Sequence, residues 1–317
     1  MGDLQNAALV AVRDCLGITG NETLLVVTDP PLAALASVLV EAARPLAREV
    51  LLVVYGEREV NGQEPPRPVP EAMASVDAVL AVTSKSVTHT AARRAATAAG
   101  ARVATMPGIT PDCLIRTMNA DYHAIAERTV KVAGLLTRAR VARITTRRGT
   151  DLTLPIEGIA AIASTGLIRK SAQWGNLPSG EAYLRPEEGR AEGVVIVDGA
   201  LAGIGTLTTP VRIAVRGGLA TDVSGGEEAG RFSAQLESVG PMARNLAELG
   251  VGTNDRAVLT GKILEDEKIL GTVHVAFGNN ASMGGTVDVP FHVDGIILEP
   301  TLELDGEVVL DQGMPRF

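Results

Sequence analysis

Four short, continuous apolar runs in the first third of the chain constrain its fold most strongly. They lie at Thr23–Thr28, Val50–Tyr55, Ala78–Thr83 and Arg102–Met106. A continuous apolar run of this length, without polar alternation, is typical of a strand that is buried on both faces. Helix-like segments separate the runs, and one of them, Thr88–Ala99, is followed by Gly100 as many helices are. The alternation predicts a doubly wound parallel sheet that is covered by helices on both sides.

The pattern changes near the middle of the chain. A long, mostly helical segment over residues 110–136 precedes a cluster of arginines between Arg138 and Arg148. After Arg143, short strand-like segments are punctuated by glycine, and one clear helix is expected over Glu227–Val239. The sequence therefore predicts an α/β, Rossmann-like domain over residues 1–139. A glycine-rich, mostly antiparallel α+β domain follows over residues 140–317.

Charge and cysteine content exclude several classes of protein. The formal net charge of −8 argues against an electrostatic grip on nucleic acid or on an anionic membrane. Cys15 and Cys113 are too few for a disulfide framework or a thiolate zinc site. The N-terminus lacks the basic region of a signal peptide, and no apolar run reaches bilayer length. We therefore expect a cytoplasmic protein without nucleic-acid or membrane partners.

Nucleotide-binding motifs are absent from the ends of the four runs. Neither GxGxxG nor GxxxxGK[ST] follows any of them. The polar segment Ser84–His89 is interpreted as a capped helix start with a surface histidine rather than as a ligand site. No cofactor-binding residue is assigned on these grounds.

The segment from Glu267 to Asp294 carries the strongest chemical signal. His292 and Asp294 are two residues apart, so in a strand their side chains point to the same face. His274 lies in a second strand-like run, Thr272–Phe277. Two imidazoles and a carboxylate on neighbouring strands form a ligand set that a divalent metal ion prefers.

Two glutamates stand in unusual surroundings. Glu181 follows the turn Asn176–Gly180, and Glu248 lies within an apolar, glycine-rich stretch. A buried carboxylate is costly unless it is paired or bound to a metal ion. Taken singly, each of these residues is interpreted as an exposed turn or helix-end glutamate; together with the histidines and Asp294 they suggest a metal centre.

Four motifs in order resemble the thermophilic metalloprotease family of aminopeptidase T, aminopeptidase S and PepS. These motifs are NLPSGE, AELGVGTN, DEKILGTVHVAFG and HVD, which end at Glu181, Asn254, Gly278 and Asp294. The resemblance implies that two adjacent divalent cations, Zn, Co or Mn, are bound by Glu181, Glu248, His274, His292 and Asp294. It also implies a homodimeric metallo-aminopeptidase that releases N-terminal residues from peptides. We assign no catalytic residues beyond the five metal ligands. The water between two such cations would be the nucleophile.

Three departures from the family pattern keep other functions open. Ala281 stands where the family has a tyrosine, seven residues after the first histidine. The interval between His274 and His292 is short, and so is the chain. The 2,5-dihydroxypyridine dioxygenases resemble the same family and use one Fe(II) held by two histidines and an aspartate. His274, His292 and Asp294 supply that set, which makes a ring-cleaving dioxygenase acting on a small molecule the alternative. A binding protein with a vestigial site is the third possibility.

Overall fold

The computed structural model of the protein describes residues 2–317, and the chain divides into two compact units. Unit 1 comprises Met1–Ala126 and Thr165–Ser179, and unit 2 comprises Glu127–Ser164 and Gly180–Phe317. Each unit is thus assembled from two separate stretches of sequence. The contiguous division into residues 1–139 and 140–317 stays a prediction.

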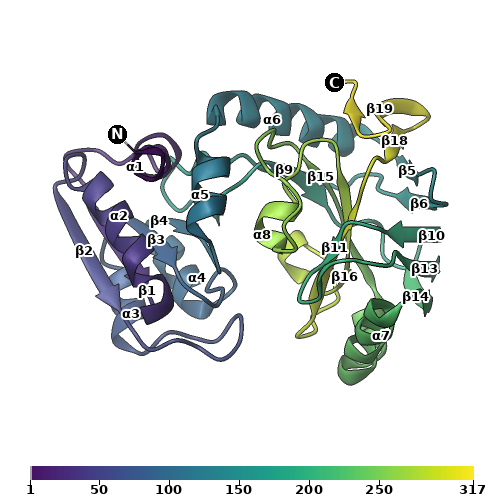
Figure 1. Cartoon of the computed structure of the whole chain (residues 1–317), viewed down its shortest axis with the longest axis horizontal. Helices are drawn as coiled ribbons and strands as arrows, with labels where there is room; N and C mark the ends of the chain where they lie inside the picture. The colour runs from purple at the N-terminus through teal and green to yellow at the C-terminus, as the bar shows by residue number, and fades with distance from the viewer. Residues whose placement is uncertain (1) are drawn as a thin grey trace. The chain divides into compact units, whose positions relative to one another are not determined.

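Unit 1 is built on a five-stranded parallel sheet with the strand order β2-β1-β3-β4-β8 (Figure 1). The strands are β1 (Thr23–Thr28), β2 (Glu49–Val54), β3 (Ala78–Val82), β4 (Arg102–Thr105) and β8 (Trp174–Asn176). The first four coincide with the apolar runs of the sequence. The predicted mixture of a parallel-sheet domain and an antiparallel domain is confirmed.

Helical elements surround the sheet of unit 1, and α2, α3 and α4 pack against its strands. They are α1 (Asp3–Leu9) with the π-helical turn η1 (Val10–Cys15), the 3-10 turn η2 (Pro30–Leu32), α2 (Ala33–Ala43), α3 (Pro68–Met73), α4 (Ala91–Ala98) and α5 (Pro111–Met118). Met73 of α3 and Ala96 of α4 pack against Leu25, Val79 and Val103 in one buried cluster. Leu24, Val26 and Leu80, which alternate with those strand residues, are also buried, so both faces of the central strands are covered.

One prediction for this unit is wrong, and one is refined by the structure. β2 is an edge strand, and its residues Leu51 and Val54 are 42% and 51% exposed, so the second apolar run is not buried on both faces. The mostly helical segment predicted over residues 110–136 consists of two helices, α5 and α6 (Tyr122–Arg138). Asn119 leaves the helical conformation with ψ 49°, and the Asp121 carboxylate then accepts hydrogen bonds from the backbone N–H groups of His123 and Ala124. This cap starts a new helix.

Unit 2 contains two antiparallel sheets. The eight-stranded sheet has the order β14-β13-β10-β6-β5-β18-β19-β20, and the seven-stranded sheet has the order β12-β11-β17-β16-β15-β9-β7. The strands of the first are β5 (Val141–Thr145), β6 (Asp151–Pro155), β10 (Glu192–Val197), β13 (Val211–Arg216), β14 (Leu219–Ser224), β18 (Thr301–Leu304), β19 (Glu307–Asp311) and β20 (Met314–Pro315). Those of the second are β7 (Ile162–Ser164), β9 (Glu181–Leu184), β11 (Ala200–Leu201), β12 (Gly205–Thr206), β15 (Leu246–Gly252), β16 (Val273–Gly278) and β17 (His292–Ile297). The helical elements are α7 (Glu227–Val239), η3 (Pro241–Arg244), α8 (Ile263–Asp266) and η4 (Ala281–Met283).

A single hydrophobic core takes side chains from both sheets. Val273, Val275 and Phe277 of β16 belong to it, together with Ile144, Val195 and Ile213 from the eight-stranded sheet. Because side chains alternate along a strand, the residues between them point to the opposite face of the seven-stranded sheet. That opposite face carries His274.

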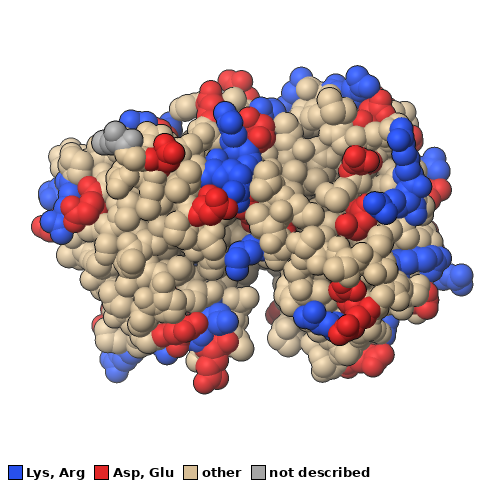
Figure 2. All heavy atoms as spheres, viewed as in Figure 1, with Lys and Arg blue, Asp and Glu red and all other residues tan. Residues whose placement is uncertain are grey.

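The surface shows no extended region of one charge on the face drawn in Figure 2, where basic and acidic side chains are interspersed. Among residues 2–317, none of the helices combines the length and apolarity that are needed to cross a bilayer.

Candidate metal centre

Four adjacent strands bring the predicted site residues onto one face of the seven-stranded sheet. Glu181 begins β9, Glu248 lies in β15, His274 in β16, and His292 and Asp294 in β17. The strand registers place Glu248 beside Ala276, and Ala276 beside Asp294. The core-facing neighbours of these residues, among them Ala182, Leu249 and Val275, fix which face the polar side chains occupy.

Small residues opposite the polar ones provide the room that the site needs. Gly250 is paired with His274, and Gly252 is paired with Glu181. A Cβ atom at Gly250 would lie 1.9 Å from Nε2 of His274, and one at Gly252 would lie 2.0 Å from the carbonyl oxygen of Ile269. The imidazole and the chain around Ile269 therefore lie directly over glycine backbone.

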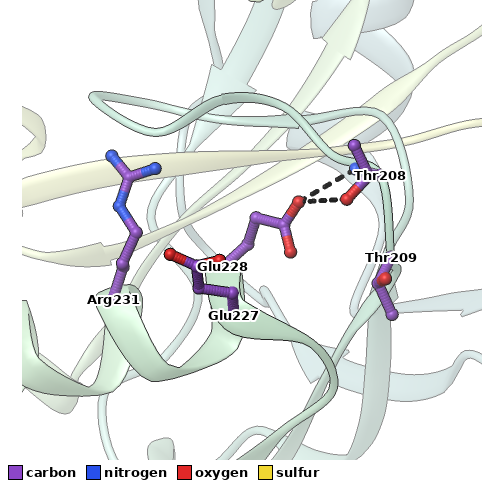
Figure 3. A pocket seen from close by; sticks show the side chains of 5 residues that line it. All are labelled: Thr208, Thr209, Glu227, Glu228 and Arg231. Carbon is purple, nitrogen blue, oxygen red and sulfur yellow. Dashed lines mark hydrogen bonds between the residues drawn. The ribbon is translucent and has the colours of Figure 1, made fainter.

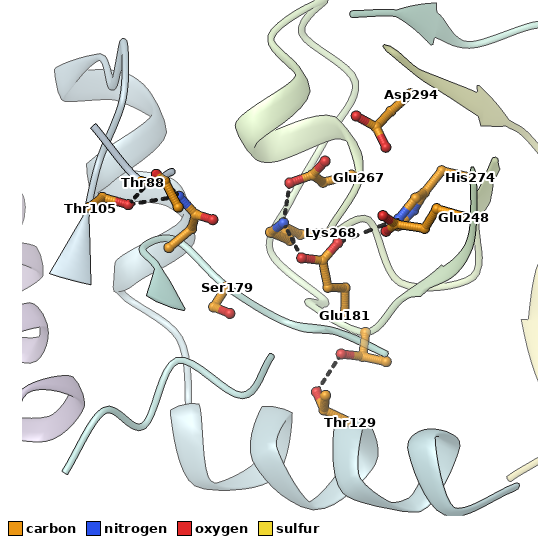
Figure 4. A network of polar contacts seen from close by, with 12 residues as sticks. Thr88, Thr105, Thr129, Ser179, Glu181, Glu248, Glu267, Lys268, His274 and Asp294 are labelled. Atoms are coloured by element: carbon orange, nitrogen blue, oxygen red, sulfur yellow. Dashed lines mark hydrogen bonds and ion pairs between the residues drawn. The ribbon is translucent and has the colours of Figure 1, made fainter. Parts of the chain in front are cut away.

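The five predicted residues form one connected cluster, and Figure 4 labels four of them, Glu181, Glu248, His274 and Asp294. Nε2 of His274 lies 3.5 Å from Glu181 Oε2 and 3.4 Å from Glu248 Oε1. Nε2 of His292 lies 3.4 Å from Glu248 Oε2 and 3.5 Å from Asp294 Oδ1. Bonds of about 2.0–2.2 Å to a shared first-row dication place neighbouring donor atoms roughly 3 to 3.5 Å apart. The spacing thus fits atoms that surround an ion.

A compact subset has the geometry of a binding site by itself. Glu248, His292 and Asp294 offer ligand atoms that all lie within 4.8 Å of one another. His274 adds a further argument, because both of its ring nitrogens are buried without a hydrogen-bond partner. Buried polar atoms are nearly always satisfied, so an orphaned imidazole beside carboxylates indicates a missing ligand. These donors fit a metal ion.

His292 is held in one orientation from outside the cluster. Its Nδ1 lies 2.8 Å from the carbonyl oxygen of Asn279, to which it donates if the proton is on that nitrogen. This tautomer leaves Nε2 free to bind a metal ion, which is the usual arrangement of a metal-bound histidine. The side chain of His292 is 35% exposed, so the cluster is reached by solvent from this side.

Two residues that the sequence analysis did not select complete the cluster. Nζ of Lys268 donates to Glu181 Oε1 at 2.6 Å and also contacts Glu267 (Figure 4). The Lys268 side chain is fully buried. Tyr183 lies on the same face, since it is paired with Gly250. The only signal for Lys268 was its place before the strand of His274, and a single sequence does not reveal that a lysine is buried.

The electrostatics follow from burial among opposite charges. Burial alone would lower the pKa of His274, but Glu248 and Glu181 raise it to about 9. Burial alone would raise the pKa of Glu248, but the two imidazoles lower it to about 2. The pKa of Lys268 lies above its ordinary value, because Glu181 and Glu267 outweigh its burial. The pKa of Tyr183 is raised by burial and by Glu181, so its hydroxyl stays neutral.

A second, open pocket lies at the start of α7 and is unrelated to this cluster. It encloses about 300 Å³ and is lined by Thr208, Thr209, Glu227, Glu228 and Arg231 (Figure 3). The Glu228 carboxylate accepts hydrogen bonds from the backbone N–H and the hydroxyl of Thr208, at 3.1 and 2.5 Å. No imidazole lines it, and we assign it no role.

Two solved structures share the fold of this chain. A 2,5-dihydroxypyridine dioxygenase from Pseudomonas putida KT2440 superimposes with a TM-score of 0.84 at 19% identity, covering 99% of this chain and 98% of that one. Wild-type AmpT from Thermus thermophilus superimposes with a TM-score of 0.76 at 19% identity, covering 99% of both chains. The chain has the fold shared by these two proteins, and likeness at this identity shows the fold alone.

A comparison of sequences shows the family to which the chain belongs. Residues 34–315 match the family model of 2,5-dihydroxypyridine 5,6-dioxygenase, and the chain belongs to this family. A 2,5-dihydroxypyridine 5,6-dioxygenase from Pseudomonas putida KT2440 is 24% identical over 204 residues. That alignment covers 59% of this chain, and the chain spans only 57% of that relative's length in it.

The prediction of a metallo-aminopeptidase is wrong. The family match and the sequence relative are dioxygenases, which are oxidoreductases, so hydrolase, metalloprotease and proteolysis do not describe this chain. The resemblance to aminopeptidase T is supported by the fold only. Metal binding agrees with the donor set, but nothing supports the predicted pair of Zn, Co or Mn ions.

Proposed function

We propose that the chain is a non-heme Fe(II) dioxygenase that opens a hydroxylated pyridine-type ring, with His274, His292 and Asp294 as the iron ligands. The family match supports this activity. The main structural observation behind the proposal is the set of two histidines and one carboxylate on β16 and β17. This ligand set is typical of Fe(II) oxygenases. The orphaned nitrogens of His274 support its inclusion in the set.

Each ligand is held by the strand that carries it. His274 and Asp294 are buried, and their strands are neighbours, so their positions are fixed by the sheet rather than by a loop. His292 is oriented by the Asn279 carbonyl. An iron ion held by these three side chains would supply the chemistry that brings a hydroxylated ring and dioxygen together.

The neighbouring groups set the charge of the site. Glu248 contacts both imidazoles and remains ionised, so it balances the charge of a bound dication. The Tyr183 hydroxyl is on the same face and stays a neutral hydrogen-bond donor. The exposed side of His292 gives a small substrate access.

The test measures iron and oxygen together. The protein is purified without oxygen, loaded with Fe(II), and supplied with 2,5-dihydroxypyridine while oxygen uptake and ring absorbance are followed. We expect uptake of one dioxygen per ring lost. Asp294→Ala should lose both iron and activity, whereas Asp222→Ala, which alters an exposed ion pair with Arg212 on the other sheet, should keep both.

Two results would contradict the proposal. One is iron-loaded protein that consumes no oxygen with any dihydroxypyridine, which would favour a binding protein. The other is full activity of Asp294→Ala. The homodimer implied by the resemblance remains a separate proposal, and light scattering of the purified protein should give twice the chain mass.

A further inference from the structure

We propose that Glu188 is a positioning residue for His292. Its carboxylate holds the connection between β16 and β17 in the conformation that presents the Asn279 carbonyl to the imidazole. Glu188 lies between β9 and β10, on neither of the two strands that carry the proposed iron ligands. The inference deepens the proposed function, because it rests on His292 being one of those ligands.

The connection between the two ligand strands has little regular structure of its own. It runs over residues 279–291, from the end of β16 at Gly278 to the start of β17 at His292, and contains only the short turn η4. Its first residue supplies the carbonyl that lies 2.8 Å from Nδ1 of His292. The orientation of this imidazole therefore depends on hydrogen bonds that fix the connection.

The Glu188 carboxylate accepts three hydrogen bonds from this connection. Oε1 accepts from the backbone N–H of Thr286 at 2.6 Å and from Nδ2 of Asn280 at 2.9 Å, and Oε2 accepts from the Thr286 hydroxyl at 2.5 Å. Burial alone would raise the pKa of Glu188, but the bonds from Thr286 and Asn280 lower it. The carboxylate is therefore ionised, and hydrogen bonds to an ionised acceptor are the stronger kind.

Asn280 links Glu188 to the carbonyl that orients the imidazole. Its side chain is fully buried, and its Oδ1 accepts from the backbone N–H of Val287 at 3.0 Å. Its own backbone N–H donates to the Val287 carbonyl, also at 3.0 Å. This N–H and the carbonyl of Asn279 belong to one planar peptide group, so fixing the direction of the N–H fixes the direction of the carbonyl.

Loss of the Glu188 carboxylate would leave the buried amide of Asn280 without this acceptor. An unsatisfied buried donor is costly, so the connection would shift until the amide reached another partner. The peptide group between Asn279 and Asn280 would turn with it, and His292 would lose the contact that orients its ring. The expected result is weaker metal binding with all three proposed ligands still present.

Titration with Mn²⁺ alone tests this without substrate or oxygen. The purified full chain is stripped of metal, and the dissociation constant for Mn²⁺ is measured. Glu188→Ala should weaken binding about tenfold. Glu188→Gln keeps an oxygen that accepts from Asn280 and Thr286, so its affinity should stay within about twofold of the unaltered protein. The matched control is Glu187→Ala, which alters the neighbouring glutamate and its ion pair with Arg190 and should leave the affinity unaltered.

A double-mutant cycle separates positioning from a general loss of stability. Glu188→Ala and Asn279→Ala both act on the carbonyl that orients His292. The combined variant should therefore bind Mn²⁺ no more than about threefold more weakly than the weaker of the two single variants. Independent effects on the fold would instead multiply.

A milder variant covers the case in which Glu188→Ala does not fold, as judged by circular dichroism. Thr286→Val changes an exposed residue and removes only the hydroxyl bond to Glu188 Oε2. Since the other two bonds remain, we expect Mn²⁺ affinity to fall about threefold.

Three results would overturn the inference: unaltered Mn²⁺ affinity of folded Glu188→Ala, unaltered affinity of Thr286→Val, or effects of Glu188→Ala and Asn279→Ala that multiply. A failure of the proposed function looks different. If these variants weaken Mn²⁺ binding as expected but the unaltered protein consumes no oxygen, the dioxygenase is contradicted and the role of Glu188 stands. An active dioxygenase whose Mn²⁺ affinity is unchanged by Glu188→Ala contradicts the role of Glu188 alone.

Discussion

Gly250 and His274 face each other across the β15–β16 pair, and the imidazole ring fills the space that a side chain at position 250 would need. A Cβ there would lie 1.9 Å from Nε2 and 2.3 Å from Cε1 of the ring. Those atoms belong to the part of His274 that faces Glu181 and Glu248. The absence of a side chain at Gly250 is thus a condition for the position of a proposed iron ligand.

Gly250→Ala should therefore disable the metal centre with little change in overall fold. The added methyl group forces the ring of His274 off its position, because contacts below 3 Å are not tolerated. We expect iron content and oxygen uptake to fall at least tenfold while the far-ultraviolet circular dichroism is kept. The iron assay after Fe(II) loading is the measurement.

The matched control is Gly230→Ala. Gly230 lies in α7, and a Cβ there meets nothing within 4 Å. Alanine should stabilise that helix by about 0.5–1 kcal/mol and leave the iron content unchanged. Equal iron loading of both alanine variants would show that His274 is not a ligand or that the ring has another stable position.

Four of the five strands of the parallel sheet were accessible to sequence reasoning because each is a compact, apolar run, whereas β8, Trp174–Asn176, is not apolar and was not predicted. Residues Thr23–Thr28 are recognisable without tertiary information, and β1 has those same bounds. β15 is different, because its residues Leu246–Gly252 mix apolar side chains with a glutamate and glycines. Glycine is unfavourable within strands. Here Gly250 and Gly252 are required by close contacts with His274 and Ile269, and only the folded protein contains these contacts.

The side chains of the candidate site could be selected from the sequence, but their contacts with one another could not. The spacing of His292 and Asp294 on one strand follows from a period of two, and the structure places both in β17. The partner of Glu181 did not follow from any pattern, because Lys268 comes from the segment between α8 and β16. A charged residue before an apolar strand is usually exposed, and only tertiary packing makes this one buried.

Removing the metal ion should destabilise unit 2. Without it, the carboxylates of Glu248 and Asp294 remain close together with only the imidazoles between them. An ion present at 100 times its dissociation constant stabilises the folded state by about 2.7 kcal/mol. We expect the melting temperature to fall on treatment with a chelator and to recover when Fe(II) is added back without oxygen, as measured by calorimetry. An unchanged melting temperature after verified metal removal would contradict this.

Asn279→Ala should weaken metal binding from outside the ligand set. The Asn279 side chain donates to Asp288 at 2.7 Å and to the Val289 carbonyl at 3.0 Å, which fixes the carbonyl that orients His292. Loss of such an outer contact typically costs about 10–100-fold in metal affinity. Titration with Mn²⁺ measures the change. Asn6→Ala, which removes an exposed side-chain bond to Asn119 in unit 1, should leave the affinity unaltered.

The ion pair between Glu22 and Arg102 predicts a pH-dependent stability of unit 1. Burial alone would raise the pKa of Glu22, but hydrogen bonds from Arg102, at 2.7 Å, and from Thr19 lower it. A carboxylate with a lowered pKa contributes stability above its unfolded pKa of about 4.3, and this contribution is lost as the pH falls through the folded value. Glu22→Gln should lower the free energy of unfolding by roughly 1.5–3 kcal/mol at pH 7 and by progressively less below pH 4.

Urea unfolding of unit 1 measures this change. The single tryptophan, Trp174, lies on β8 of the same unit, so its fluorescence follows the unfolding there. The control is Glu41→Gln, which alters an exposed ion pair with Arg44 and should lower the free energy of unfolding by less than about 0.5 kcal/mol at any pH. If Glu22→Gln lowered the free energy of unfolding equally at pH 7 and pH 3, the ionised pair would contribute nothing to stability.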